Sequence, residues 1–334
     1  MSIPHADVLE YIFFGIQALQ SSSSPRLPLI MGATIDEDIK ERIWNGKINI
    51  KVSLAPIDHK VNASQISFYT RLPRNSFLPI YLPQMLDFFA SSIKDPEWAN
   101  QGNWWFSFQD VPIRWNLPIG VNFDIMTGLN PDEPTLEEWN IILNYSNYPN
   151  TIVPIFNSKK SNGANFHRHD DRIQFFHVYW LNQMKESCYC INGNCNSIMS
   201  LSKTDSNLFW GSLLSHARDT FMSINQKHVP LDPLNIRIIP IRIHISILNK
   251  VIQPNVTPTK DDQKDLTTLG DILQETIPEL FPSSLMYTIA FPITHGIKLP
   301  INLSLIDLYS YFAFSDGFVH ISVVFNQPKP LYII

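Results

Sequence analysis

Two stretches of this chain begin with strands in which apolar and polar residues alternate strictly. In the first, Ile48, Ile50, Val52 and Leu54 are separated by polar residues. In the second, isoleucine occupies every other position from Ile239 to Ile247. Alternation with a period of two is typical of a strand with one face in a core and the other toward water. The sequence therefore predicts a half-buried sheet in each half of the chain.

The overall composition argues for a scaffold rather than an enzyme. A chain of 334 residues is long for one hydrophobic core and suits two or three domains. Its net charge of −5 gives no sign of the basic surface that binds nucleic acid. With only 12 glycines against 25 prolines, a glycine-rich phosphate loop is disfavoured, and no Gly-x-Ser-x-Gly nucleophile motif occurs.

The cysteines and the N-terminal segment indicate the cellular compartment. Cys188, Cys190 and Cys195 are an odd, clustered set, which favours a reducing compartment over a disulfide framework. Val8–Leu19 is apolar but too short to span a bilayer. We interpret it as a short amphipathic helix followed by a linker at Ser21–Ser24. The sequence thus predicts a soluble protein whose membrane association, if any, is peripheral.

The first half of the chain has the element order of a β-grasp module. The expected elements are a helix at Ile35–Trp44, strands at Lys47–Leu54 and Ile66–Leu72, a helix at Pro83–Ile93 beginning with its proline, a hairpin at Trp104–Trp115 turning at Gln109-Asp110, a short helix at Ile119–Met126 and a strand at Trp139–Tyr145. Two strands, a helix and further strands are the order of a ubiquitin-like fold.

A different pattern follows in the middle of the chain. After a polar loop at 159–165, Arg172–Met184 carries bulky residues at helical spacing. A second helix is predicted from Ser202, with Asp205 completing an N-cap pattern, and it continues through Ile224. The sequence predicts two antiparallel helices joined by a loop that carries the cysteines.

The last third repeats the order of the first. Its expected elements are the isoleucine strand, a helix at Leu269–Ile277 capped by Thr268, strands at Leu285–Ile293 and Phe318–Phe325, and a short helix at Leu303–Tyr311. The predicted fold is α+β, with two ubiquitin-like β-grasp domains flanking a helix-rich domain, and an N-terminal helix. We place an extension at 1–33, the N-terminal helix with the first ubiquitin-like domain at 34–155, the helix-rich domain at 156–230 and the second ubiquitin-like domain at 231–334.

Two clusters could hold a metal ion. His167 and His169 precede Asp170 and Asp171, and the three cysteines could combine with His177. Neither set has the spacing of a common zinc site, which needs three or four ligands in fixed geometry. A solvated loop leading into a helix, and reduced cysteines beside a turn, are the interpretations that we favour.

Lys185 lies on the central predicted helix. With 100° per residue, it points about 140° away from the arc of Phe176, Trp180 and Met184. This position predicts a solvent-facing lysine, although Val178, Leu181 and Phe175 extend the apolar surface toward its side. Most such lysines are only solvated.

Several segments resemble the autophagy protein 5 family, in consistent order from about residue 34 to 326. They are Ile39–Gly46, Leu72–Arg74, Trp105–Gly120, Gln183–Ser187, Ile198–Asp205 with Trp210, Thr268–Leu273, His295–Ile297 and Asp316–Ser322. The resemblance implies two ubiquitin-like domains flanking a helix-rich domain. It also implies that Lys185 accepts the C-terminal glycine of the ubiquitin-like autophagy protein 12 as an isopeptide.

The resemblance further implies a set of partners. The conjugate would bind a helix of autophagy protein 16 in a groove between domains and act like a ligase in the lipidation of autophagy protein 8. The conjugating enzymes of both systems would be transient partners. The chain would be a scaffold with no catalytic group and no cofactor, in the cytoplasm and, peripherally, on the preautophagosomal membrane. Two alternatives remain open: a metal-dependent enzyme using His167, His169 and the cysteines, and an adaptor that is never conjugated.

Overall fold

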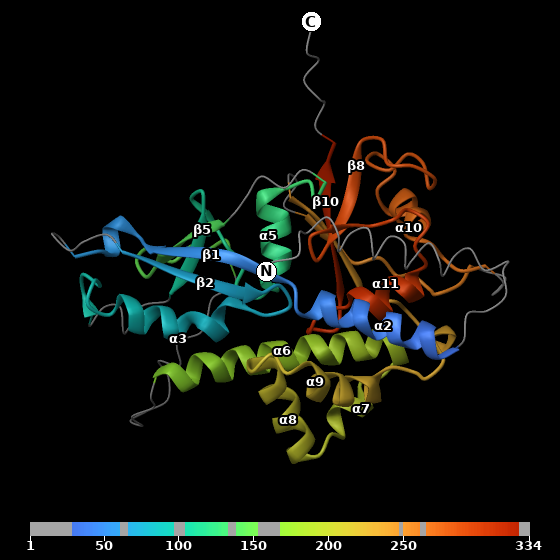
Figure 1. The fold of residues 1–334 in the computed structure, drawn as a ribbon, viewed down its shortest axis with the longest axis horizontal. Helices are drawn as coiled ribbons and strands as arrows, with labels where there is room; N and C mark the ends of the chain where they lie inside the picture. The colour runs from blue at the N-terminus through green and yellow to red at the C-terminus, as the bar shows by residue number, and fades with distance from the viewer. Residues whose placement is uncertain are drawn as a thin grey trace, which may run out of the picture.

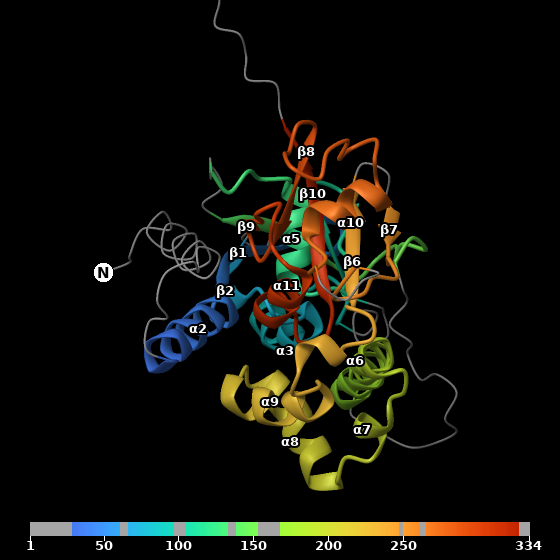
Figure 2. The same cartoon turned by 90° about the vertical axis from the view of Figure 1, so that its right-hand side faces the viewer.

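The computed structural model describes residues 29–60, 66–96, 104–132, 138–152, 168–246, 250–260 and 265–326. For the helical residues 29–35 and 168–172, only the backbone is described. The predicted helix Val8–Leu19, the serine linker, the loop at 159–165 and His167 lie outside these ranges. Two sheets stand beside one another, and a group of helices lies beneath them (Figures 1 and 2).

The first sheet has the predicted β-grasp topology. Its elements are β1 (Lys47–Leu54), β2 (Ser67–Pro73), α3 (Leu78–Phe89), β3 (Trp105–Phe108), β4 (Val111–Pro112), α5 (Ile119–Thr127) and β5 (Trp139–Asn144). The strand order is β2-β1-β5-β3-β4, with β1 and β5 parallel. The alternation in β1 is confirmed, because all four apolar residues are buried while the polar ones are exposed or half-buried.

Two local predictions in this domain have different outcomes. Gln109 and Asp110 have φ values of +49° and +62°, as a two-residue hairpin turn requires, so the hairpin is confirmed. The helix predicted from Pro83 is wrong at its start, because α3 begins at Leu78 and Pro79 occupies its first turn. Pro83 lies inside α3, where its missing N–H removes one backbone hydrogen bond. Burial of the apolar face of α3 compensates for that loss.

The second sheet repeats the topology of the first. Its elements are β6 (Ile241–Ile245), β7 (Lys250–Ile252), α10 (Leu269–Thr276), β8 (Ala290–Thr294), β9 (Ile297–Lys298), α11 (Leu305–Phe312) and β10 (Val319–Phe325). The order is β7-β6-β10-β8-β9, with β6 and β10 parallel. The Thr268 cap of α10 is confirmed as a full capping box with Asp271. The strand predicted from Leu285 is wrong at its start, since Leu285 is exposed and pairing begins at Ala290.

The prediction of a half-buried second sheet is wrong. Isoleucines 241, 243 and 245 fill the core as expected, but His244, on the opposite face, is only 2% exposed. Every residue of β8 and all but the last of β10 are buried. The reason is that α5 of the first domain packs against β8 and β10, so that it lies between the two sheets (Figure 1). Polar residues at alternate positions therefore face another domain rather than water.

The helical domain differs from the predicted helix pair. It contains α6 (Arg168–Asn192), α7 (Asn196–Met199), α8 (Lys203–Leu214) and α9 (Arg218–Asn225). Cys188 and Cys190 belong to the last turns of α6, so they do not form a loop. Short 3-10 helices occur at Pro56–Asp58, Gln226–His228 and Pro233–Asn235.

The single helix predicted from Ser202 to Ile224 is broken at His216. Ser202 caps α8 as expected, but His216 has a φ of +54° and ends that run. Its Nε2 lies 3.0 Å from the carbonyl oxygen of Trp44, and its ring stacks on the Trp44 indole at 4.9 Å. These contacts with a distant helix stabilise the break.

The N-terminal helix α2 (Leu29–Trp44) connects all parts of the molecule. It begins six residues before the predicted start. Ile39 and Ile43 belong to the core of the second ubiquitin-like domain, and Trp44 belongs to the core of the helical domain. Among the described helices, none is long and apolar enough to cross a membrane.

Candidate functional site: the Lys185 turn of α6

Lys185 lies in the second half of the long helix α6. The buried face of α6 contains Phe176, Trp180, Met184 and Cys188, as helical spacing predicts. Lys185 is half-buried and forms no hydrogen bond or ion pair with any described residue. Along the same stripe of the helix, Val178 and Tyr189 are 51% and 57% exposed. The buried face of α6 therefore fixes the position of Lys185, while its ammonium group has no described partner.

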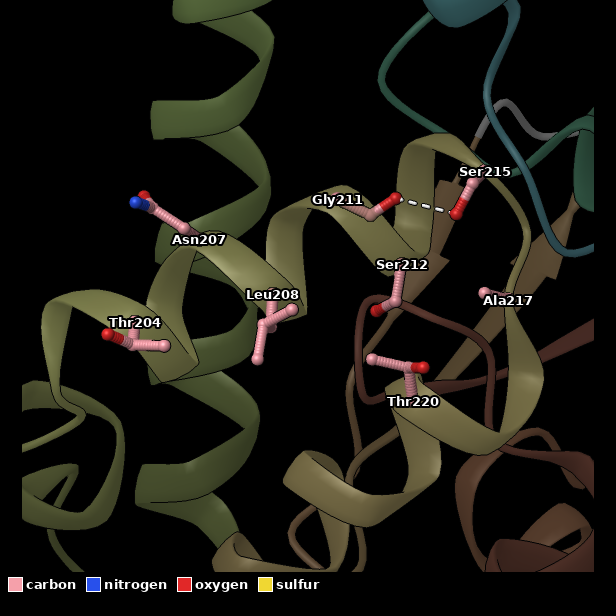
Figure 3. Close-up of a pocket in the computed structure, with 8 residues that line it drawn as sticks. All are labelled: Thr204, Asn207, Leu208, Gly211, Ser212, Ser215, Ala217 and Thr220. Atoms are coloured by element: carbon pink, nitrogen blue, oxygen red, sulfur yellow. Dashed lines mark hydrogen bonds between the residues drawn. The ribbon is translucent and has the colours of Figure 1, made fainter.

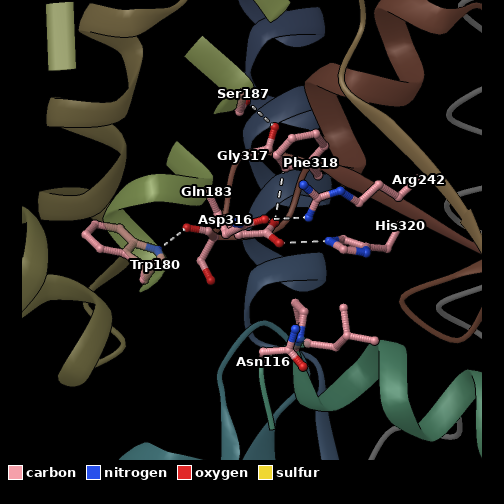
Figure 4. Close-up of polar contacts among 12 residues, drawn as sticks. Asn116, Trp180, Gln183, Ser187, Arg242, Asp316, Gly317, Phe318 and His320 are labelled. Carbon is pink, nitrogen blue, oxygen red and sulfur yellow. Dashed lines mark hydrogen bonds and ion pairs between the residues drawn. The ribbon is translucent and has the colours of Figure 1, made fainter. Parts of the chain in front are cut away.

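Both ends of the Lys185 segment are attached to the loop that precedes β10. The Trp180 indole Nε1–H donates to the carbonyl oxygen of Ser315 over 2.7 Å. The Ser187 hydroxyl donates to the carbonyl oxygen of Gly317 over 2.6 Å (Figure 4). Gly317 has a φ of +83°, and a Cβ there would lie 2.6 Å from the Ser187 oxygen. Only glycine gives both this backbone conformation and this close approach.

Arg242 of β6 holds the residues on either side of Lys185. Its Nη1 donates to Gln183 over 2.7 Å, and its Nη2 pairs with Glu186 over 3.0 Å. The guanidinium also lies 3.6 Å above the ring of Phe318, a favourable cation–π geometry. The sequence pattern placed Arg242 on a water-facing strand side, so its role was missed. A basic residue in an alternating strand has the same sequence pattern whether water or another domain covers that face.

Behind this contact lies a buried chain of polar groups. The Asp316 carboxylate accepts from His320 Nε2 over 2.8 Å, and His320 Nδ1 lies 2.9 Å from His244 Nε2. Burial, the neighbouring His320 and the charge of Arg242 lower the pKa of His244 well below its usual value. His244 is therefore neutral, and one of the two ring nitrogens donates the hydrogen bond to the other. Burial is the largest single influence on Asp316 and raises its pKa, but His320, the charge of Arg242 and the N–H of Phe318 together outweigh burial and lower that pKa.

The first ubiquitin-like domain joins the same junction. Asn75 accepts from the backbone N–H of Ser315 over 2.6 Å. Arg74 pairs with the buried Asp124 of α5 over 2.9 Å, and the other oxygen of Asp124 accepts from the N–H of Gly296 over 3.0 Å. The segments Leu72–Arg74, His295–Ile297 and Asp316–Ser322, which are far apart in sequence, thus meet around one junction.

The metal-site hypothesis finds no support among the described side chains. No group of three or more His, Cys, Asp or Glu residues in the described ranges could hold a metal ion. The buried Cys188 thiol lies 3.2 Å from the Ser197 hydroxyl, and His177 stacks on Trp210 at 4.3 Å. His169 lies in the first turn of α6, where only the backbone is described.

An open groove between α8 and α9 is a second candidate (Figure 3). Its volume is about 450 Å³, and its lining includes Thr204, Leu208, Ser212 and Thr220. None of the eight lining residues is ionisable. The Ser215 hydroxyl donates to the carbonyl oxygen of Gly211 over 2.8 Å. The groove therefore offers no acid, base or thiol for catalysis.

Comparison with known proteins agrees with this architecture. Family models described as "Autophagy protein ATG5" match the UblA domain at residues 43–145, the alpha-helical bundle region at 173–231 and the UblB domain at 238–323.

Individual relatives give the same result. Autophagy protein 5 of Pichia angusta is 35% identical over 292 residues, covering 87% of this chain and 97% of that protein. Autophagy protein 5 of Vanderwaltozyma polyspora is 31% identical, covering 86% and 95%. The crystal structure of Kluyveromyces marxianus Atg5 superposes with a TM-score of 0.68 at 28% identity, covering 86% of this chain and 99% of that one. The chain belongs to the autophagy protein 5 family, and is an autophagy protein built on two ubiquitin-like domains.

Proposed function

We propose that this protein is an autophagy scaffold that accepts the ubiquitin-like autophagy protein 12 on Lys185. The observation that supports this most is the contrast within one helical turn. Gln183, Glu186 and Ser187 are all bound to the second ubiquitin-like domain, while Lys185 between them has no described partner. A lysine presented in this way keeps its reactive nitrogen free at a fixed place.

The proposed step is an acyl transfer from a thioester on a conjugating enzyme. The ε-nitrogen of Lys185 attacks the carbonyl carbon of the C-terminal glycine of autophagy protein 12. The isopeptide C–N bond forms, the C–S bond breaks, and the enzyme's cysteine leaves as a thiolate. Lysine in model peptides has a pKa of about 10.4, so the amine must lose a proton to react at neutral pH. The proton acceptor is proposed to come from the conjugating enzyme.

The conjugate would then act as a non-catalytic part of a ligase-like assembly. A helix of autophagy protein 16 would dock in a groove between domains, a known mode of helix recognition. The assembly would promote transfer of autophagy protein 8 from its conjugating enzyme to phosphatidylethanolamine. This work would take place in the cytoplasm and at the preautophagosomal membrane, with peripheral attachment. The three-domain junction supports this proposal, because a scaffold must hold its partners at constant distances.

Substitution of Lys185 tests the acceptor directly. With the conjugating enzymes and autophagy protein 12 supplied, the wild-type chain should gain the mass of one autophagy protein 12, and Lys185→Arg should not. Lys203→Arg, at an exposed lysine of the same domain, is the matched control and should conjugate normally. Full conjugation of Lys185→Arg would show that the site is wrong. An unmodified mass for the wild-type protein in autophagy-competent cells would favour the adaptor instead.

A further inference from the structure

The first sheet ends in β2, which has a neighbouring strand on one side only among the described residues. β2 is seven residues long, whereas the other outer strands of the two described sheets, β4, β7 and β9, have two or three residues. In an antiparallel pair, every second residue points its N–H and C=O away from the partner strand. In the described part of the chain, no backbone hydrogen bond outside the ladders involves residues 67–72. This edge can accept a further strand.

One side of this edge is aromatic. Phe68 of β2 lies 5.2 Å from Phe88 of α3, measured between ring centroids. Phe88 is 41% exposed, and Phe68 is half-buried against the core. α3 runs beneath β1 and β2 (Figure 1). An added strand would therefore meet an apolar surface on this side.

The opposite side of the edge is cationic. Lys51 pairs in register with Tyr69, and its ammonium lies 5.7 Å from the Tyr69 ring centroid. Arg71 is exposed two residues further along β2, and Lys47 is exposed on the same face of β1. None of these three cations forms an ion pair with a described residue. These three cations lie on one face of the first sheet, although the net charge of the chain is −5.

Protection of the edge against aggregation explains only part of this arrangement. Charged residues and a terminal proline, such as Arg71 and Pro73, are common devices that protect edge strands. The aromatic residues go against that purpose, because Tyr69 is 63% exposed and Phe88 is 41% exposed. Exposed aromatics beside an open edge favour the binding of a strand rather than its exclusion.

We propose that β2 binds an extended peptide in which acidic and apolar residues alternate. Successive side chains of a strand point to opposite faces, so the acidic residues would meet Lys51 and Arg71. The apolar residues between them would meet Phe68 and Phe88. The backbone of the peptide would pair with the free N–H and C=O groups of β2. This interaction is independent of conjugation at Lys185.

The test uses the full chain and a fluorescent eight-residue peptide that alternates Glu and Val. Fluorescence anisotropy should show binding that weakens as NaCl rises, because salt screens exposed charges. The double variant Lys51→Glu, Arg71→Glu should bind at least about tenfold more weakly, a loss of about 1.4 kcal/mol. Lys250→Glu, an exposed lysine on the edge strand of the other sheet, is the matched control and should bind like the wild type. Amide exchange in β2 should slow when the peptide is bound.

Three results would overturn the proposal. The first is the absence of binding at low salt by variants and wild type alike. The second is equal binding of a peptide with the same composition in two blocks, which would indicate attraction by charge alone. The third is a wild-type protein that does not bind the peptide but co-sediments with anionic vesicles, while the double variant does not co-sediment. That result would show that the cations bind a membrane surface instead of a peptide. Equal melting temperatures of wild type and variants would show that a loss of binding is not a loss of fold.

Discussion

His295 lies at the contact of the two ubiquitin-like domains and is held there without a charge. It is 6% exposed, its Nε2–H donates to the carbonyl oxygen of Phe312 over 3.2 Å, and its ring stacks on Phe314 at 3.8 Å. Burial, and then the nearby charge of Arg74, lower the pKa of His295 to about 3. We expect this residue to make the junction sensitive to acid.

The sign and size of the effect follow from the two pKa values. In the unfolded chain a histidine has a pKa of about 6.5, so below that pH the unfolded state binds a proton that the native state does not. Stability therefore rises with pH between about 3 and 6.5 and is unaffected by His295 above that range. At about 1.36 kcal/mol per pH unit, lowering the pH from 7.5 to 5 should remove about 2 kcal/mol through this residue.

The assay compares the wild type with His295→Asn. Asparagine keeps an N–H donor and tolerates the φ of +51° found at this position. Urea unfolding, followed through amide signals of β8 and β10, reports on the second domain alone. We expect the variant to have a lower free energy of unfolding than the wild type at pH 7.5. At pH 5 this difference should be smaller by about 2 kcal/mol. Between pH 7.5 and 9 the difference in free energy of unfolding between wild type and variant should stay constant, which is the internal control.

A direct titration decides whether the reasoning holds. The C2–H resonance of His295 should not shift between pH 8 and 5. A titration midpoint near 6.5, or a stability gap that does not change with pH, would refute the assignment of a neutral, buried histidine.

Three further substitutions test the junction and one cap. Gly317→Ala should destabilise the protein by about 2 kcal/mol or more, through the left-handed backbone and the clash with Ser187, so a melting temperature like the wild type's would contradict the proposed fit. Asp124→Ala leaves the charge of Arg74 without its described partner and should cost about 3–5 kcal/mol in urea unfolding, whereas a cost below about 1 kcal/mol would show that the pair is dispensable. Thr268→Ala removes the N-cap of α10 and should cost about 1 kcal/mol, read as faster amide exchange in its first turn, and unchanged exchange would argue against the cap.

The parts of the fold that depend on local signals could be predicted from the sequence. The alternation in β1, the turn at Gln109-Asp110, and the caps Ser202 and Thr268 act over a few residues, so their patterns were sufficient. The repeated order of elements also predicted two β-grasp domains. For the candidate site, the residues alone placed Lys185 on a helix. Only the family resemblance distinguished it from other surface lysines.

Tertiary structure decided what each element packs against. The N-terminal helix α2 contributes Ile39 and Ile43 to the second domain's core, His216 breaks a helix to reach Trp44, and α5 covers a sheet face that alternates like a solvated one. The contacts of Arg242 and Gly317 with the Lys185 turn join residues more than fifty positions apart in the sequence. A pattern of apolar residues records which side of an element is buried most strongly, because burial of apolar area is local to that side. It does not record which distant polar surface will cover the other side, since that depends on shape and hydrogen-bond geometry that form only when the domains meet.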